Sequence, residues 1–227
     1  MKKEEIIKKY KTEALMGIDD LRAIISMLRA PDGCPWDKVQ THESIRNNFI
    51  EETYEAVEAI DNSDIPLLRE ELGDVLLQVV FHTCMEEEKG SFSLDDVANE
   101  VCRKLVLRHP HVFSDVQADT VGAVLSNWDA IKQKSKHQST VTETLESVAR
   151  SLPALMRAEK MYGRAVKGGY ACAAMPSEDD SSVGADLLRI VCKAKDSGIE
   201  AEQQLYEACD AMTERVRKAE NTVYNEK

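Results

Sequence analysis

The stretch EETYEAVEAIDNSDIPLLREELGD, residues 51–74, decides the fold and holds an unusual concentration of acids. Glu52 and Glu55 stand one helical turn apart before the turn sequence NSDIP, and Glu71 and Asp74 stand one turn apart after it. The connection between the two segments is short, which makes antiparallel packing natural. The sequence therefore predicts a helical hairpin with E-x-x-E on one helix and E-x-x-D on its neighbour.

Burial is the physical problem that these acids raise. Asp74 lies in LGDVLLQVVF, which is apolar on nearly all sides, so we expect its side chain to be buried. A buried carboxylate must be protonated, paired with a cation or bound to a metal. The first helix is more ordinary: Glu51 and Glu58 extend its acidic side, and its opposite side is expected to be buried through Ile45, Phe49, Val57 and Ile60. A solvated acidic face is the alternative interpretation for that helix taken alone.

Composition indicates an all-α protein of 227 residues with a formal charge of -12. Aromatic residues are only 5%, and Gly and Pro are sparse, which favours helix over sheet. The charged N-terminus and the absence of a long apolar run predict a cytoplasmic protein without a membrane segment. The six cysteines form no C-x-x-C pair and are expected to be reduced and buried. The acidic charge argues against a nucleic-acid polymer as partner.

Helical periodicity and breakers divide the chain into four parts. Residues 1–16 are a charged lead-in, and 17–136 form the main helical domain. Within it, GIDDLRAIISMLRA, a helix capped by Thr41, a helix capped near Asp64 and ending at Gly90, LDDVANEVCRKLVLR, and DTVGAVLSNWDAIKQKSK are predicted helices. Residues 137–147 are interpreted as a linker, and 148–227 as a second helical domain in which YACAAMPSEDDSS is a second linker or loop.

The second domain looks like a degenerate copy of part of the first. Residues 184–220 can be laid over residues 73–108, with an Asp, two Leu, an apolar stretch, a Gly turn and an amphipathic helix in the same order. Asp186 then stands where Asp74 does, while Val183 replaces Glu71. The copy has no counterpart of the helix with Glu52 and Glu55, so any chemistry of the acids belongs to the first domain.

Carboxylates alone make up the predicted cluster, which favours a hard dication. Glu52, Glu55, Glu71 and Asp74 offer only oxygen atoms, the ligands that Mg²⁺ and Mn²⁺ prefer. Histidine is missing from the group, which argues against zinc or a di-iron bundle. His82 lies two turns beyond Asp74 and is expected to be a satisfied core histidine.

Four segments in order, CPWDKVQTHESI, EETYEA, REELGDVLLQVVFH and LVLRHPHVF, resemble the MazG family of nucleoside triphosphate pyrophosphohydrolases, an all-α superfamily. The resemblance is strong over about residues 17–135 and weak over 148–220. It implies Mg²⁺-dependent hydrolysis of a nucleoside triphosphate between the α and β phosphates. It also implies metal ligation by Glu52, Glu55, Glu71 and Asp74, with Glu51 as an extra ligand or as the base that activates water.

The resemblance further implies two basic pairs for the phosphates. Lys104 with Arg108 matches the Lys-x-x-x-Arg pair, and Trp128 with Lys132 matches the Trp-x-x-x-Lys pair. Each pair would share a helix face, and without the acids a surface lysine and a half-buried tryptophan would be the ordinary interpretation. In the CPWD loop, Trp36 and Lys38 are candidates to contact the base or ribose, although Trp36 is equally suited to anchor the loop to the core.

A homodimer or higher oligomer is also implied, because active sites of this superfamily are commonly completed by a partner subunit. Two rival functions remain open at the level of sequence. One is a nucleotide-binding or regulatory module that has lost catalysis, which would bind nucleotide without a Mg²⁺-dependent product. The other is a helical interaction protein whose acidic face binds a basic partner and needs no metal, so that its melting temperature would not respond to Mg²⁺ and nucleotide.

Overall fold

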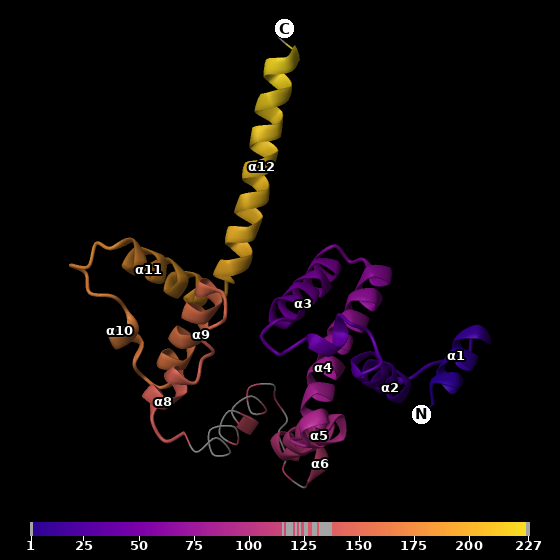
Figure 1. Ribbon diagram of the computed structural model, residues 1–227. Coiled ribbons are helices and arrows are strands. Elements are labelled where there is room, and N and C mark those ends of the chain that lie inside the picture. The colour runs from indigo at the N-terminus through magenta and orange to yellow at the C-terminus, as the bar shows by residue number, and fades with distance from the viewer. Residues whose placement is uncertain are drawn as a thin grey trace. The chain divides into compact units, whose positions relative to one another are not determined.

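The computed structural model describes residues 2–114 and 138–225, together with 116, 120, 122, 124, 127, 128 and 131. All elements in this part of the chain are helices, which confirms the predicted all-α class. The described chain forms two compact units, residues 1–107 and residues 108–227 (Figure 1). The predicted helix 119–136 lies mostly outside the described residues, and the boundaries 17–136, 137–147 and 148–227 stay a prediction.

The first unit is built on a helical hairpin. The helices of the unit are α1 (Lys3–Lys11), α2 (Ile18–Arg29), the short 3₁₀ helix η1 (Asp37–Val39), α3 (Arg46–Asp61), α4 (Ile65–Lys89) and α5 (Leu94–Arg108). A three-residue turn joins α3 to α4, and the two helices pack side by side (Figure 1). The unpredicted α1 lies in the charged lead-in, where the acids of its first turn and the lysines of its last turn suit the helix dipole.

Local sequence explains both ends of α4. The Asp64 side chain accepts a hydrogen bond from the backbone N–H of Leu67 at 3.0 Å, and Pro66 stands in the first turn, where its missing N–H costs nothing. Gly90 closes the helix in the left-handed conformation with φ 70°. Both boundaries agree with the sequence prediction. The exact length of α4 matters because this helix carries Glu71, Asp74 and His82.

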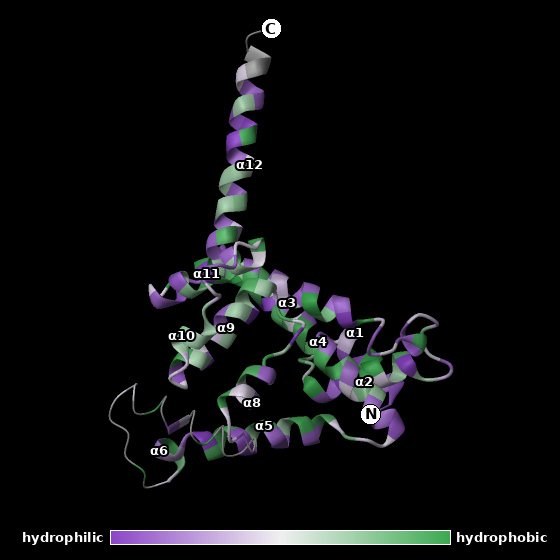
Figure 2. Cartoon of the chain, turned by 90° about the vertical axis from the view of Figure 1, so that its left-hand side faces the viewer, coloured by the Kyte–Doolittle hydropathy of each residue, from purple (hydrophilic) through white to green (hydrophobic). Residues whose placement is uncertain are grey.

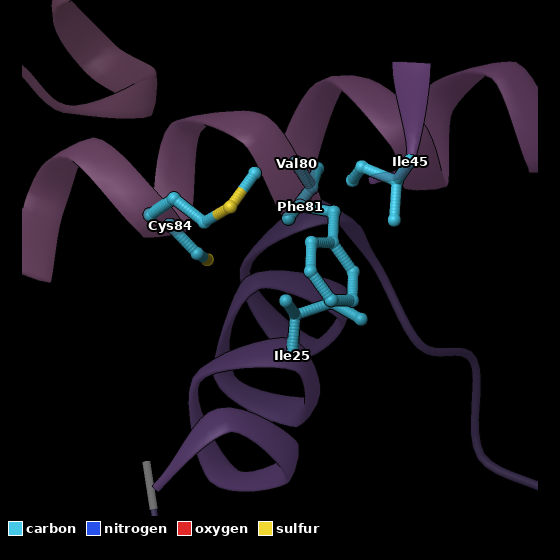
Figure 3. Packing of buried hydrophobic residues seen from close by; sticks show 6 residues of the cluster. Ile25, Ile45, Val80, Phe81 and Cys84 are labelled. Atoms are coloured by element: carbon cyan, nitrogen blue, oxygen red, sulfur yellow. The ribbon is translucent and has the colours of Figure 1, made fainter. Parts of the chain in front are cut away.

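The core of the first unit lies where α2 and the start of α3 meet the C-terminal half of α4 (Figure 3). Val80 is fully buried, and the other buried members are Ile25, Ile45, Phe81, Cys84 and Met85. Burial of this apolar surface holds α4 in place at roughly 25 cal/mol for each Å² removed from water. The acid-bearing half of α4 lies N-terminal to this core.

Two details of the first unit differ from the sequence prediction. Helix α3 begins at Arg46 rather than after Thr41, because Thr41 and Ser44 exchange side-chain and backbone hydrogen bonds in a turn. The buried positions of α3 are Ala56 and Ala59, whereas Val57 and Ile60, expected to be buried, are 43% and 58% exposed. The hairpin packs through small residues, so the larger apolar side chains of α3 remain on its surface.

The cysteines are also less buried than expected. None forms a disulfide within the described chain, and only Cys84 and Cys192 are buried. Burial raises the pKa of the Cys84 thiol to about 11, which makes it an unreactive packing group. Cys102, Cys172 and Cys209 are exposed within the described part of the chain.

The second unit contains α6 (Pro110–Phe113), α8 (Val141–Glu146), α9 (Ala154–Lys167), α10 (Ala171–Ala174), α11 (Val183–Asp196) and α12 (Ala201–Asn225). The stretch predicted as a linker holds α8, whose capping box joins Thr140 and Glu143 through reciprocal hydrogen bonds. The stretch YACAAMPSEDDSS likewise contains the single turn α10. Polar composition alone does not exclude short capped helices.

Helices α11 and α12 follow one another through a glycine turn, as α4 and α5 do, while the degenerate repeat stays a prediction. Gly198 ends α11 with φ 71°, the counterpart of Gly90 at the end of α4. Beyond Ala201, the described side chains of α12 are exposed or half-exposed, and the helix extends away from the rest of its unit (Figure 1). Among the described residues no helix is both long and apolar enough to cross a membrane.

Candidate active site

The α3–α4 hairpin brings three acids to one point. Carboxylate oxygens of Glu52 and Glu55 from α3, and of Glu71 from α4, all lie within 4.8 Å of one another. Glu55 is exposed, Glu52 is half-buried and Glu71 is only 8% exposed. The sequence spacing placed these residues correctly, since a turn of helix separates the first two and antiparallel packing brings the third opposite them.

Asp74 and Glu51 lie beside this group. Asp74 is half-buried rather than buried as predicted, because its side of α4 is only partly covered within this chain; Glu71 is the buried acid. Asp74 is nevertheless close enough for its charge to act on both Glu52 and Glu71. Glu51 is exposed, and its charge acts on Glu52.

Electrostatics makes the group unfavourable when all its members are ionised. Burial is the main cause that raises the pKa of Glu52, followed by the charges of Asp74, Glu55 and Glu51. Burial also raises the pKa of Glu71, with the charges of Glu55 and Asp74 adding to it. Within the described chain no lysine or arginine forms an ion pair with these acids. The group therefore lacks a counter-charge.

A hard divalent cation fits this arrangement. The donors are carboxylate oxygens from two rigid helices, the geometry that suits Mg²⁺ or Mn²⁺. A cation would remove the repulsion that raises the two pKa values, which no side chain of the described chain does. The acid group is thus a candidate metal centre on chemical grounds, independently of any resemblance.

The predicted phosphate-binding residues make a contact between the two sequence pairs, Lys104 with Arg108 and Trp128 with Lys132. Lys104 is exposed on α5, and Arg108 ends the same helix one turn later. The Arg108 guanidinium lies over the Trp128 ring, 5.1 Å from its centroid, so a member of each predicted pair contacts a member of the other. The Arg108 Nε is buried without a hydrogen-bond partner. Lys132 lies outside the described residues.

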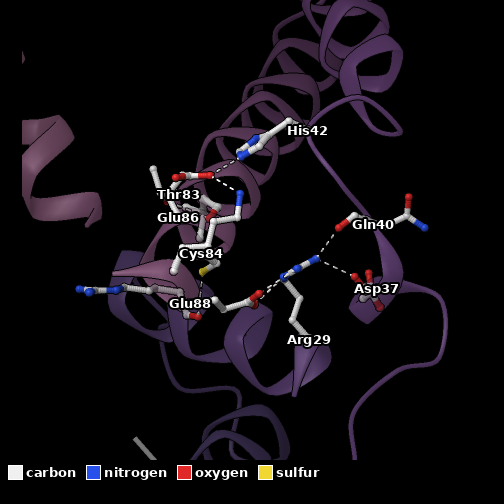
Figure 4. Close-up of polar contacts among 11 residues, drawn as sticks. Arg29, Asp37, Gln40, His42, Thr83, Cys84, Glu86 and Glu88 are labelled. Carbon is white, nitrogen blue, oxygen red and sulfur yellow. Dashed lines mark hydrogen bonds and ion pairs between the residues drawn. The ribbon is translucent and has the colours of Figure 1, made fainter. Parts of the chain in front are cut away.

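The CPWD loop is held by an arginine that sequence reasoning missed. Arg29 Nη1 donates to the backbone carbonyls of Asp37 at 2.8 Å and Gln40 at 3.2 Å (Figure 4). Its other edge binds both carboxylate oxygens of Glu88 on α4. Trp36 is 59% exposed and does not anchor the loop. The exposed ring stays available to a ligand, while Lys38 is exposed and donates to the carbonyl of Pro31 at 3.2 Å.

A histidine pair lies further along α4. His42 Nδ1 and His82 Nδ1 are 2.7 Å apart. On its other side, His42 Nε2 lies 2.7 Å from a Glu86 oxygen, a contact drawn in Figure 4. Hydrogen bonds from Lys89 first, and from His42 next, lower the pKa of Glu86 to about 2. His82 is half-buried beside an open recess, so it is not the core histidine that was expected. The i, i+4 spacing of His82 and Glu86 was visible in the sequence, but the partner His42 was not.

Comparison with known proteins agrees with this geometry. The family model of the MazG nucleotide pyrophosphohydrolase domain matches residues 40–113, the segment that holds the acids, the histidine pair and α5. YabN of Bacillus subtilis is 50% identical over 140 residues, which are 62% of this chain and 28% of that protein. The nucleoside triphosphate pyrophosphohydrolase of Escherichia coli K12 is 45% identical over 67% of this chain and 59% of that protein.

A third relative matches nearly end to end. It is the nucleoside triphosphate pyrophosphohydrolase/pyrophosphatase MazG of Thermotoga maritima, 34% identical over 93% of this chain and 88% of that protein. The fold and the acidic centre define an all-α protein with a carboxylate site on a helical hairpin. The chain belongs to the MazG family. The chain spans less than two thirds of the length of YabN and of the Escherichia coli protein.

Proposed function

We propose that the chain is a nucleoside triphosphate pyrophosphohydrolase, which cleaves the α–β phosphoanhydride with water to give the nucleoside monophosphate and pyrophosphate. The observation that carries the proposal is the group formed by Glu52, Glu55 and Glu71, an uncompensated carboxylate cluster on the hairpin of a MazG-family chain. The names of the Escherichia coli and Thermotoga maritima relatives support the same activity. A substrate that carries Mg²⁺ on its phosphates fits this cluster.

We propose Glu52, Glu55, Glu71 and Asp74 as ligands of Mg²⁺, with Mn²⁺ as a substitute. The bound ion supplies positive charge against the phosphate oxygens and lowers the pKa of water. The protein itself fixes the oxygen donors on two packed helices, so no reorganisation is needed when substrate arrives. Glu51 is exposed next to Glu52, and we propose it as the base that takes the proton of the attacking water.

Basic residues are proposed to hold the leaving pyrophosphate. The Arg108 guanidinium lies over the Trp128 ring, which limits the side-chain entropy that Arg108 loses when it binds a phosphate. Lys104 and Lys132 add point charges, and Trp36 with Lys38 are proposed to contact the base or ribose. Reduced exposed thiols and the nucleotide substrate both suit a cytoplasmic protein, which we propose as its location.

The test is incubation of the full-length protein with a panel of ribo- and deoxynucleoside triphosphates, with and without Mg²⁺. Products are separated into monophosphate, diphosphate, pyrophosphate and phosphate. We expect monophosphate and pyrophosphate in equal amounts, only with the metal. Diphosphate and phosphate would place the cleavage at the β–γ bond and contradict the proposal. Nucleotide binding without any product would favour a silent module instead.

Single-residue variants assign the site. Glu52→Gln and Asp74→Asn should each lower turnover by roughly a hundredfold or more, as loss of groups that stabilise transition-state charge does. Glu58→Gln is the matched control, because Glu58 is an exposed acid of α3 outside the three-acid group. Substantial activity in a folded Glu52→Gln protein would remove Glu52 from the proposed centre.

We further propose that the protein is a homodimer or higher homo-oligomer. Residues 204–222 of α12 are all exposed, yet Leu205, Cys209, Met212 and Val216 follow one another at spacings of four, three and four residues, as in a coiled-coil seam. Apolar residues recur between polar ones along this helix (Figure 2). Helix α5 is likewise exposed from residue 95 to residue 107, including Val97 and Val101. Light scattering coupled to gel filtration should give at least twice the 25.4 kDa of one chain.

A further inference from the structure

An open recess of about 670 Å³ lies in the first unit, beside the histidine pair. Its walls come from the residues before and at the start of α3, from the middle of α4 and from the segment that begins α5. Phe49, Phe92 and His82 supply flat rings, and Arg46 supplies a guanidinium with no ion pair within the described chain. The recess has the size of a ligand pocket, and its walls suit a planar ring with polar edges.

Hydrogen bonds fix which atom of His82 is available. The ionised carboxylate of Glu86 accepts from His42 Nε2–H, so a neutral His42 keeps a lone pair on Nδ1. That lone pair accepts from His82 Nδ1–H at 2.7 Å, and the second nitrogen of a neutral His82, Nε2, is then an acceptor. Within the described chain this Nε2 has no partner.

The ring of His82 is also held in position. It stacks on His42 with the ring centroids 5.0 Å apart and the planes 3° from parallel. The Phe49 ring also contacts His82, with centroids 5.6 Å apart and planes tilted by 40°. Burial, and next to it the charge that His42 carries when it is protonated, lowers the pKa of His82, which favours the neutral ring of His82. A fixed neutral imidazole with a free acceptor is suited to select a hydrogen-bond donor on a ligand.

One face of α4 connects this recess with the acids. Glu71, Asp74, Gln78 and His82 follow at spacings of three, four and four residues, which keeps them in one stripe. The eight residues from Asp74 to His82 correspond to about 12 Å along the helix. This length is comparable to the span of a nucleotide from its α-phosphate to the edge of its base.

Gln78 stands between the two ends of the stripe. Gln78 is 8% exposed, and its side-chain oxygen Oε1 is buried without any hydrogen-bond partner among the described residues. A buried acceptor left unsatisfied is costly to the folded chain. Gln78 is not among the residues that line the recess, so it is given no contact with the ligand.

We propose that this recess takes the base of the substrate triphosphate, with His82 Nε2 accepting a hydrogen bond from an exocyclic amino group. The inference rests on the proposed function and deepens it, because it names what the enzyme selects. Adenine and cytosine carry the amino group, whereas hypoxanthine and uracil carry an oxygen in its place.

The experiment compares kcat/KM at pH 8 for ATP against ITP and for CTP against UTP. The wild type should prefer the amino-bearing member of each pair by about tenfold, the effect of one net hydrogen bond. His82→Leu removes the acceptor and should bring both ratios close to one, mainly by lowering kcat/KM for ATP and CTP. His82→Gln can place its Oε1 near the position of Nε2 and should keep most of the preference.

Other outcomes overturn the inference. If the histidine pair only ties the loop to α4, His82→Leu will lower kcat/KM for all four nucleotides by the same factor and leave the ratios unchanged. Equal wild-type rates within each pair, or a preference for the oxygen-bearing bases, contradict it even where His82→Leu does not fold. His111→Leu, outside the recess, should change no ratio. A wild type that hydrolyses no nucleotide refutes the proposed function and this inference together.

Discussion

At the scale of single residues, the spacing of the acids predicted their meeting but not their relative burial. Glu52, Glu55 and Glu71 come together because helical periodicity and a short turn leave few alternatives. The sequence predicted that Asp74 is the buried acid, whereas in the structure the buried acid is Glu71. The burial of each acid depends on which side of α4 is covered by α3. Hydropathy could not show that α3 packs through Ala56 and Ala59, because larger apolar residues occupy another side of the same helix.

The buried acid should cost the folded protein stability when no metal is present. The raised pKa means that folded Glu71 holds its proton more tightly than unfolded Glu71, so its ionisation weakens folding as pH rises through that pKa. We expect Glu71→Gln to raise Tm at pH 8 in the presence of a chelator, with little change at pH 4. Glu58→Gln, which removes an exposed acid of α3, should not raise it. An unchanged or lower Tm for Glu71→Gln in chelator would contradict the uncompensated burial.

Mg²⁺ binding should be sensitive to pH for the same reason. The raised pKa values of Glu52 and Glu71 mean that protons compete with the metal below those values, and the affinity should increase as pH rises through them. Isothermal titration calorimetry of Mg²⁺ in buffers of different ionisation enthalpy would measure proton release directly. Binding that releases no proton at any acidic pH at which the protein stays folded would mean that these two acids are not ligands.

At the scale of elements, helix ends with strong local chemistry were predictable and long-range ties were not. Asp64 and Gly90 define α4 from sequence alone, because a cap and a left-handed glycine act within one turn. Thr41 was wrongly chosen as the cap of α3, since its hydrogen bonds with Ser44 close a separate turn. The contact of Arg29 with the CPWD loop joins residues that no periodicity connects.

The cap of α4 gives a local test of stability. Asp64→Ala leaves the N–H of Leu67 without its side-chain acceptor, which should lower the free energy of unfolding by about 1 kcal/mol. Chemical denaturation monitored by circular dichroism would measure it. Asp64→Asn can still accept the bond and should recover most of the loss; equal losses in both variants would show that the cap is not the cause.

The contact of Arg29 with the CPWD loop can be tested with a variant that keeps the positive charge but loses the guanidinium shape. Arg29→Lys keeps the charge but cannot serve Asp37, Gln40 and Glu88 together, so the loss should be roughly 1–3 kcal/mol of unfolding free energy. Limited proteolysis should then cleave first within residues 34–41. Arg150→Lys, at an exposed position, is the control and should match the wild type. Unchanged proteolysis of Arg29→Lys would mean that other contacts hold the loop.

At the scale of the whole molecule, the apolar stripes of the outlying helices bear on assembly. The sequence indicated two helical units with a degenerate second repeat, but it could not show that α5 and α12 would both be left exposed by the described part of the chain. Helices with exposed apolar stripes gain most of their stability when a partner covers them. A second copy offers the same stripe and so satisfies both chains at once.

This argument makes the α12 stripe testable without assuming which way two helices pair. Met212→Glu places a charge in the stripe and should lower the molar mass measured by light scattering, or weaken association by at least tenfold if other surfaces contribute. Glu214→Lys, on the same exposed helix but outside the stripe, is the matched control and should keep the wild-type mass. A wild type that runs as one 25.4 kDa chain at all concentrations would refute the assembly and leave the acidic centre to act within a single subunit.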